Sequence, residues 1–170
     1  MPFGPRVLGL DPGSHHTGYA VVEPGSRPND FRLLAAGTIH APAKKPLNTR
    51  LLAIFEKLTQ IIGRTSPVEM AVEGIFTYKN ARTALILGHA RGVALLASSL
   101  SGLEVFEYTP TSVKKALVGN GRATKEQVRA MTIQILGKPL DLGLDATDAL
   151  ALAITHLNTR KINAMLERCK

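Results

Sequence analysis

The order of strand and helix patterns along this chain is the feature that most restricts its fold. Three strand patterns come first, at residues 6–10, 17–23 and 31–40, and they favour an antiparallel meander. A helix pattern then leads to a strand at 68–73, and a second helix pattern leads to a strand at 104–108. Because helical crossovers join parallel strands, the sequence predicts an α/β domain with a mixed five-stranded sheet flanked by helices.

The helices of this domain have recognisable boundaries. The patterns predict helices over residues 48–64, 80–100, 111–118 and 124–136, and a last helix that begins at Asp145. Thr124 and Gln127 form a capping-box pattern at one of these starts. With 170 residues the chain has the length of a single domain, which we place at residues 1–158. Residues 159–170 are left as a C-terminal tail whose order the sequence does not decide.

Positive charge is concentrated in the middle of the chain. The formal net charge is +8, and residues 74–138 hold nine basic and three acidic side chains, a net +6. This suggests a polyanionic partner, with nucleic acid as the first choice, although a solvated surface would give the same pattern. The single cysteine excludes an internal disulfide framework and a multi-cysteine zinc site. No apolar stretch reaches the roughly 18 to 20 residues of a membrane span, so we expect a soluble, cytoplasmic protein with no membrane partner.

Four acidic residues stand at the ends of predicted elements. Asp11 and Glu73 end two strand patterns, and functional groups gather at the carboxyl ends of parallel strands. Asp145 and Asp148 are three residues apart at the start of the last helix, so they share one helix face. If these elements are neighbours, the four carboxylates converge and need a cation to stay ionised. Hard oxygen ligands favour Mg²⁺ or Mn²⁺, and a pair of such ions suits phosphoryl chemistry.

Each of these acids also has an ordinary structural explanation. Asp11 precedes a Pro-Gly pair and can be a turn residue, and Glu73 can be an exposed strand end. Asp145 can be only an N-cap, with Asp148 complementing the helix dipole. Spacing alone does not show that the four side chains meet. Their occurrence together in a basic chain favours the metal site.

Four segments of the chain resemble a known family. They are GLDPGSHHTGYAVVE (9–23), AVEGIFTYKNARTALILGHARGV (71–93), VKKALVGNGRATKEQV (113–128) and LDATDALALAITH (144–156). In this order they resemble the RuvC-type Holliday junction resolvases, from about residue 6 to residue 158. The resemblance implies a retroviral-integrase (RNase H-like) fold. It also implies a homodimeric endonuclease that resolves four-way DNA junctions in recombination and repair, by paired nicks with Mg²⁺ or Mn²⁺.

The resemblance also assigns roles to individual residues. It carries the catalytic, metal-binding carboxylates onto Asp11, Glu73, Asp145 and Asp148, with two ions expected in each active site. Lys125 matches a lysine near the family's active site and would hold the scissile phosphate. A junction-migration motor complex of the RuvA/RuvB type is implied as a partner. One departure is Gly74, because the family usually has a polar side chain directly after the catalytic glutamate.

Further DNA contacts are predicted around these carboxylates. The candidates are Phe76, Tyr78, Lys79, Arg82, Lys114, Arg122 and Lys125. Aromatic rings stack on unpaired bases, and the resemblance favours Phe76 for this role with Tyr78 in support. Either ring can instead anchor its loop in the core. Lys115 and Arg129 can equally lie on solvated helix faces.

A stripe of small residues marks the predicted helix over 80–100. Ala84, Gly88 and Gly92 recur at four-residue spacing, which allows another element to approach closely. The stripe can pack on the domain's own sheet. The family instead uses the corresponding helix in its dimer interface, and a two-fold dimer would supply two sites for two opposed strands.

Three other classes of protein remain as alternatives. YqgF-type nuclease-like proteins share a D-x-G turn, but they lack the GHARGV and ATDALALAITH patterns. An actin-like ATPase needs two such domains and a second phosphate loop. A non-catalytic junction-binding protein gains nothing from four acids that face phosphate.

Overall fold

The strands and helices of the protein follow the predicted order. The computed structural model describes residues 4–27, 29–74, 80–137 and 141–168. Its strands are β1 (Val7–Asp11), β2 (His16–Pro24), β3 (Phe31–His40), β4 (Glu69–Glu73) and β5 (Glu104–Tyr108). Its helices are α1 (Leu47–Thr65), α2 (Ala81–Leu100), α3 (Pro110–Val118), α4 (Lys125–Leu136) and α5 (Leu144–Arg168).

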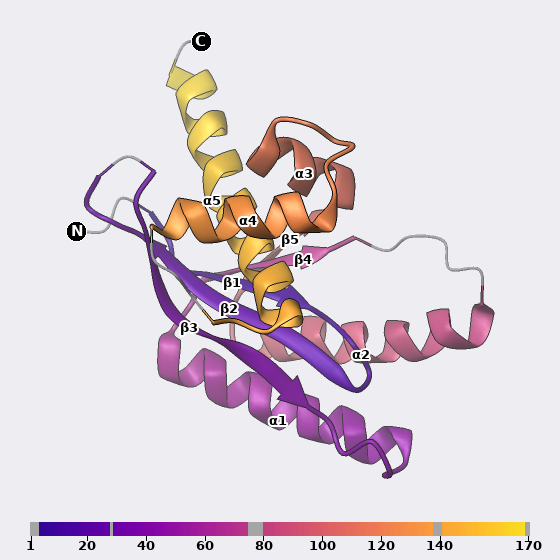
Figure 1. Ribbon diagram of the computed structural model, residues 1–170. Helices are drawn as coiled ribbons and strands as arrows, with labels where there is room; N and C mark the ends of the chain where they lie inside the picture. Colours follow the sequence, from indigo (N-terminus) through magenta and orange to yellow (C-terminus); the bar gives the residue numbers. More distant parts are fainter. Residues whose placement is uncertain (1–3, 28, 75–79, 138–140, 169–170) are drawn as a thin grey trace.

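The strands form a mixed sheet in the order β3-β2-β1-β4-β5 (Figure 1). β1 pairs antiparallel with β2, and β2 pairs antiparallel with β3, as the meander predicts. β4 joins the other side of β1 in parallel, and β5 adds in parallel to β4. The predicted five-stranded mixed sheet is therefore confirmed, and the carboxyl ends of β1 and β4 lie next to each other.

Helices cover both faces of this sheet (Figure 1). Residues that alternate along the strands separate into two buried clusters, because successive side chains of a strand point to opposite faces. Val7 and Ala71 face α5, with α3 and α4 packed beside it. Leu8 and Val72 face α1 and α2. The helix α5 thus runs across the centre of one face and carries its first turn to the carboxyl end of β1.

Two glycines let α5 lie directly on the sheet. A Cβ atom at Gly9 would lie 1.9 Å from the carbonyl oxygen of Ala149, and one at Gly18 would lie 2.1 Å from the carbonyl oxygen of Asp145. Both distances are far shorter than any real contact, so neither position has room for a side chain. The backbone of α5 consequently sets the height of Asp145 above the sheet.

The helix α5 continues well beyond the predicted domain boundary. It ends at Arg168, so residues 159–168 of the tail are helical. Their exposed apolar side chains include Ile162, Met165 and Leu166. The division between a domain at 1–158 and a tail at 159–170 stays a prediction.

The helix α2 differs from one sequence expectation. By length and composition it is apolar enough to cross a membrane, with a mean hydropathy of 1.3, whereas no segment was expected to reach that level. A core helix of a soluble protein meets the same criterion. Here the helix packs its Ala90, Ala94 and Ala97 against the sheet, and its buried Arg91 pairs with Glu107 of β5.

We predict that Gly18→Ala destabilises the protein by about 1–3 kcal/mol or more, because α5 must move away from β2. Urea denaturation followed by circular dichroism measures the change. The matched control is Gly63→Ala, since a Cβ atom at Gly63 on α1 meets nothing within 4 Å. That control should gain about 0.5–1 kcal/mol from the lower entropy of the unfolded chain. Equal stabilities for both variants would contradict the close packing.

The ion pairs of Glu23 with Arg6 and Arg32 should contribute to stability in a way that depends on pH. Burial by itself would raise the pKa of this carboxyl, but hydrogen bonds from Arg6 and Arg32 outweigh burial and lower the pKa below 4.5. Because the folded-state pKa is lowered, the contribution is present above pH 4.5 and is lost as the pH falls through the lower value. Urea denaturation between pH 3 and 6 should therefore show a steeper acid loss for the wild type than for Glu23→Gln. The exposed Glu56→Gln should follow the wild type, and a Glu23→Gln curve of wild-type slope would contradict the prediction.

Candidate active site

The sheet and α5 bring the four predicted carboxylates to one place. Asp11 ends β1 and Glu73 ends β4, and the parallel register that pairs Leu10 with Val72 makes these two acids the next pair along. Asp145 and Asp148 occupy the first turns of α5, above β2 and β1. All four side chains are partly buried. Three separate elements therefore supply one acidic centre.

The electrostatics of Asp11 show how closely the four charges interact. Burial raises the pKa of Asp11 to about 7, and the negative charges of Glu73, Asp148 and Asp145 contribute to the same shift. The pKa of Glu73 is also raised, first by burial and then by Asp148. The positive charge of Lys125 opposes both shifts. A divalent cation would relieve the same repulsion, and carboxylate oxygens are the donors that hard cations select.

The side chains do not yet form a closed ligand shell. Among the residues that the structure describes, no three acidic or histidine side chains lie close enough together to enclose a metal ion as they stand. The chemistry of the donor set fits Mg²⁺ or Mn²⁺.

Two basic residues of α4 stand beside the carboxylates. The capping box of Thr124 and Gln127 starts this helix and places Lys125 at its first position. One turn later, Arg129 pairs with Asp148 at 3.4 Å from Nε to Oδ1. From the sequence, Arg129 could equally lie on a solvated helix face. In the structure it is instead the partner of Asp148, a predicted metal ligand.

Arg91 of α2 holds the end of β4 from the face of the sheet that α1 and α2 cover. Its buried guanidinium donates a hydrogen bond to the backbone carbonyl of Glu73 and forms an ion pair with Glu107, with 2.6 Å between Nη2 and Oε1. Arg91 lies within the GHARGV pattern, and the sequence alone assigns it no role. An arginine among the apolar residues of the helix was the available signal, because a buried charge needs a partner.

The backbone beside Glu73 is fixed as well. The N–H of Gly74 donates to the carbonyl of Tyr108 at 2.8 Å, which extends the pairing of β4 with β5. A Cβ atom at Gly74 would lie 3.6 Å from that carbonyl, an ordinary contact. The packing therefore does not require glycine here, and the missing polar side chain is a difference in sequence only.

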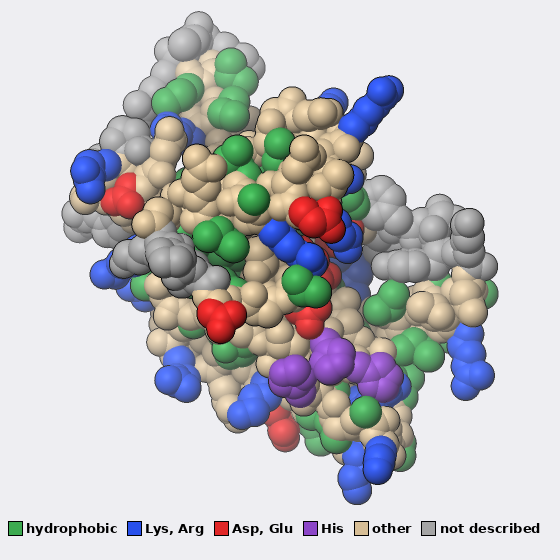
Figure 2. Space-filling view, in the orientation of Figure 1, with side chains coloured by type: hydrophobic (Ala, Val, Ile, Leu, Met, Phe, Trp, Pro, Cys, Tyr) green, Lys and Arg blue, Asp and Glu red, His purple; other side chains and the backbone are tan. Residues whose placement is uncertain are grey.

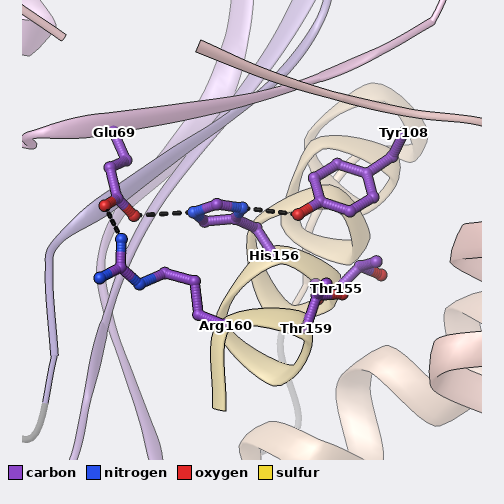
Figure 3. A network of polar contacts seen from close by, with 6 residues as sticks. All are labelled: Glu69, Tyr108, Thr155, His156, Thr159 and Arg160. Carbon is purple, nitrogen blue, oxygen red and sulfur yellow. Dashed lines mark hydrogen bonds and ion pairs between the residues drawn. The ribbon is translucent and has the colours of Figure 1, made fainter. Parts of the chain in front are cut away.

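A buried network joins the elements that carry the carboxylates (Figure 3). The Nε2 atom of His156 on α5 lies 2.7 Å from a carboxylate oxygen of Glu69 on β4, and its Nδ1 lies 2.7 Å from the hydroxyl of Tyr108 on β5. Arg160 pairs with the other oxygen of Glu69. Burial lowers the pKa of His156, although Glu69 opposes this, and the lowered pKa favours the neutral ring. A neutral ring donates from Nε2 to Glu69 and accepts from Tyr108 at Nδ1, which satisfies every atom.

The remaining predicted DNA contacts are less closely tied to the centre. Arg82 lies exposed in the first turn of α2, and Arg122 lies exposed in the connection between α3 and α4. Lys114 is partly buried on α3. The structure shows no contact between these three residues and the four carboxylates. Phe76, Tyr78 and Lys79 lie outside the described residues.

The small-residue stripe of α2 faces away from the sheet. Gly88 and Gly92 are exposed, and a Cβ atom at either position would meet nothing within 4 Å. Ala84 is partly buried, whereas the face toward the sheet is formed by Ala90 and Ala94. The alternative that the stripe packs on the domain's own sheet is therefore wrong for both glycines.

Comparison with known proteins identifies relatives along nearly the whole chain. A family model described as crossover junction endodeoxyribonuclease RuvC matches residues 7–156. The crossover junction endodeoxyribonuclease RuvC of Solidesulfovibrio magneticus is 44% identical over 159 residues, which are 94% of this chain and 93% of the relative. That of Halorhodospira halophila is 46% identical over 155 residues, 91% of both chains.

Solved structures agree with these sequence relatives. The structure of T. thermophilus RuvC in complex with a Holliday junction substrate is similar with a TM-score of 0.88 and 34% identity, covering 94% of this chain and 97% of that one. The yeast mitochondrial Holliday junction resolvase Ydc2 is similar with a TM-score of 0.66 at 9% identity, which shows the fold alone. The expected RNase H-like fold is confirmed.

We predict that Tyr108→Phe lowers the free energy of unfolding by about 1–3 kcal/mol, because the buried Nδ1 atom of His156 loses its donor. Chemical denaturation at pH 7 provides the measurement. Tyr19→Phe is the control, since the Tyr19 hydroxyl has no hydrogen bond to another residue that the structure describes, and it should change stability by less than about 0.5 kcal/mol. Equal effects of the two substitutions would show that the network adds nothing to stability.

Proposed function

Because the chain belongs to the crossover junction endodeoxyribonuclease (RuvC) family, we propose that it hydrolyses phosphodiester bonds of a four-way junction at the centre formed by Asp11, Glu73, Asp145 and Asp148. The observation that carries this proposal is the convergence of four carboxylates from β1, β4 and α5. Burial raises the pKa of Asp11 to about 7, and the negative charges of Glu73, Asp148 and Asp145 add to this shift. Such crowding is unfavourable in a purely structural role and suits a site that binds divalent cations.

The family depends on divalent metal in general, and we propose Mg²⁺ or Mn²⁺, with two ions in each site. The four carboxylates would hold them. When bound, such ions supply Lewis-acid stabilisation of the charge that develops on the scissile phosphate. Arg129 would hold the side chain of Asp148 in place, and Arg91 would hold the end of β4, which carries Glu73, in place. These two arginines are positioning residues, since each acts through a carboxylate residue.

Lys125 has a different role in this proposal. It is exposed, and it lies near enough to Asp11 and Glu73 for its positive charge to oppose the rise in the pKa of both. We assign it to a non-bridging oxygen of the scissile phosphate, where a fixed positive charge stabilises the transition state. Without that charge, the acidic centre would repel its own substrate.

A dimer is proposed for the enzyme at work. The outward glycines of α2, together with its exposed Leu85, Leu96 and Leu100, form an apolar surface on which a second copy can pack. Two-fold symmetry would present two active sites to the two opposed strands of a near-symmetric junction, giving paired nicks. Action in the bacterial cytoplasm, next to the nucleoid and together with a junction-migration motor, belongs to the same proposal.

The contacts that hold DNA outside the catalytic centre also remain proposals. T. thermophilus RuvC has been solved with a Holliday junction substrate, and we infer a similar substrate for this chain. Arg82, Lys114 and Arg122 would contact phosphates around the carboxylates. Phe76, Tyr78 and Lys79 remain predictions for stacking and for phosphate contact.

We predict that Asp11→Asn slows nicking of a mobile four-way junction by at least about 100-fold, because an amide is a weaker ligand for a divalent cation than a carboxylate. Binding to the junction should be kept or strengthened, since one negative charge beside phosphate is removed. Gel assays with Mg²⁺, Mn²⁺ or EDTA, on the junction and on linear duplex, measure both effects.

The control for this variant is Asp30→Asn, an exposed aspartate in the connection between β2 and β3. It should nick at the wild-type rate. Wild-type nicking by Asp11→Asn would remove Asp11 from the catalytic set. Cleavage by the wild type in EDTA, or equal cleavage of duplex and junction, would contradict the proposed function itself.

A further inference from the structure

Two histidines stand together at the end of the sheet that carries the carboxylates. His16 is the first residue of β2, and His40 is the last residue of β3 directly opposite. Their Nδ1 atoms lie 2.9 Å apart, and the two rings meet edge to face with 5.0 Å between centroids. Both side chains are exposed. The pair therefore forms an ordered polar feature on a surface that nothing in the proposed chemistry uses.

The register of the sheet places this pair beside the catalytic centre. Asp11 on β1 pairs with Gly18 on β2, and Gly18 touches the backbone of Asp145. His16 precedes Gly18 by two residues, so both project from the same face, about 7 Å apart along the strand. The histidine pair thus lies on the face of the sheet that carries α5. Along β2 it lies two residues before Gly18, the position that Asp145 covers.

A lysine and a pair of histidines consequently flank the carboxylates on two sides. Lys125 interacts with Glu73, on the side of β4 and β5, whereas the histidine pair lies on the side of β2 and β3. Figure 2 shows histidine side chains gathered in a single patch, close to acidic side chains. A DNA strand that crosses the carboxylates from one side of the sheet to the other meets both flanks.

The short distance between the rings restricts their protonation. A hydrogen bond between two Nδ1 atoms needs one donor and one acceptor, so the two rings cannot both be imidazolium while it persists. In the neutral pair, the ring that donates from Nδ1 has an accepting Nε2 atom. Uptake of one proton converts that Nε2 atom into a donor. The protonated pair then presents two N–H groups and one positive charge to solvent.

We propose that the His16–His40 pair, in its singly protonated form, binds the phosphodiester backbone of a junction strand next to the cleavage site. This inference rests on the proposed function. Phosphate is the ligand that matches two N–H donors with one positive charge, whereas a transition metal held between the two rings would need both Nδ1 atoms as acceptors. Junction binding should consequently be linked to proton uptake, because histidines change charge between pH 5 and 8.

The charged groups around the pair favour an anion. Lys44 and Lys45 follow His40 in the connection to α1, Arg50 of α1 contacts His15 beside His16, and the backbone of Asp145 lies against Gly18 on the same strand as His16. Arg50 is buried and its Nη1 atom lies 2.7 Å from Nε2 of His15. Asp145 is the single acid in this set, and divalent metal at the catalytic centre would offset its charge.

The test measures junction affinity by fluorescence anisotropy in EDTA at pH 6 and pH 8, over a range of salt. The wild type should bind more tightly at pH 6. The part of this gain that the double histidine variant keeps belongs to Asp11, whose pKa of about 7 lets it take up a proton in the same range. The double variant His16→Gln, His40→Gln should weaken binding at pH 6 by roughly fivefold and reduce the salt slope by about 1, as for loss of one phosphate contact. At pH 8 it should bind within about twofold of the wild type. His89→Gln, an exposed histidine of α2, is the control and should keep the pH dependence.

A second variant separates phosphate contact from a structural role. His40→Lys carries a fixed positive charge, so it should bind at pH 8 as tightly as the wild type binds at pH 6. If the wild type nicks junctions selectively, and the double variant keeps wild-type affinity and pH dependence, the histidine pair is not a DNA contact and the proposed function stands. If the wild type itself neither prefers nor nicks junctions, the proposed function fails and this inference fails with it.

Discussion

The backbone of α5 rests on the sheet without intervening side chains at Gly9 and Gly18, and the positions of the functional groups depend on this contact. Because the helix is held this close, Asp145 and Asp148 in its first turns lie level with Asp11 at the end of β1. A side chain at either glycine would force the helix outward, because its Cβ atom would lie only 1.9 or 2.1 Å from a backbone oxygen of α5. The acidic centre is therefore built by packing, before any metal contributes.

The same packing creates an electrostatic problem that the protein solves only in part. Four partly buried carboxylates repel one another. Burial raises the pKa values of Asp11 and Glu73, and this repulsion adds to both shifts. Arg91, Lys125 and Arg129 each offset some of it, from α2 and α4. These three side chains do not cancel the charge of the four carboxylates. The remaining negative charge can attract divalent cations.

Support for the centre comes from both faces of the sheet. On one face, the chain of contacts from Glu69 through His156 to Tyr108 ties β4 and β5 to α5. On the other, Arg91 connects α2 to the backbone of Glu73. The same helix, α2, presents its glycines outward. The helix that is proposed to contact a second copy therefore also holds β4, the strand that carries Glu73. Docking of a partner and placement of Glu73 would then share a single rigid element.

Much of this protein was predictable from local sequence. The strand and helix patterns, the capping box at Thr124 and the four acids at element ends follow from residues close together in the chain, because periodicity, turns and caps are short-range effects. Family resemblance then supplied the activity. The partnership of Arg129 with Asp148, the role of Arg91 and the pairing of His16 with His40 could not be read in this way. Each joins residues that are 16 or more positions apart, and only strand register and helix packing decide which distant side chains meet.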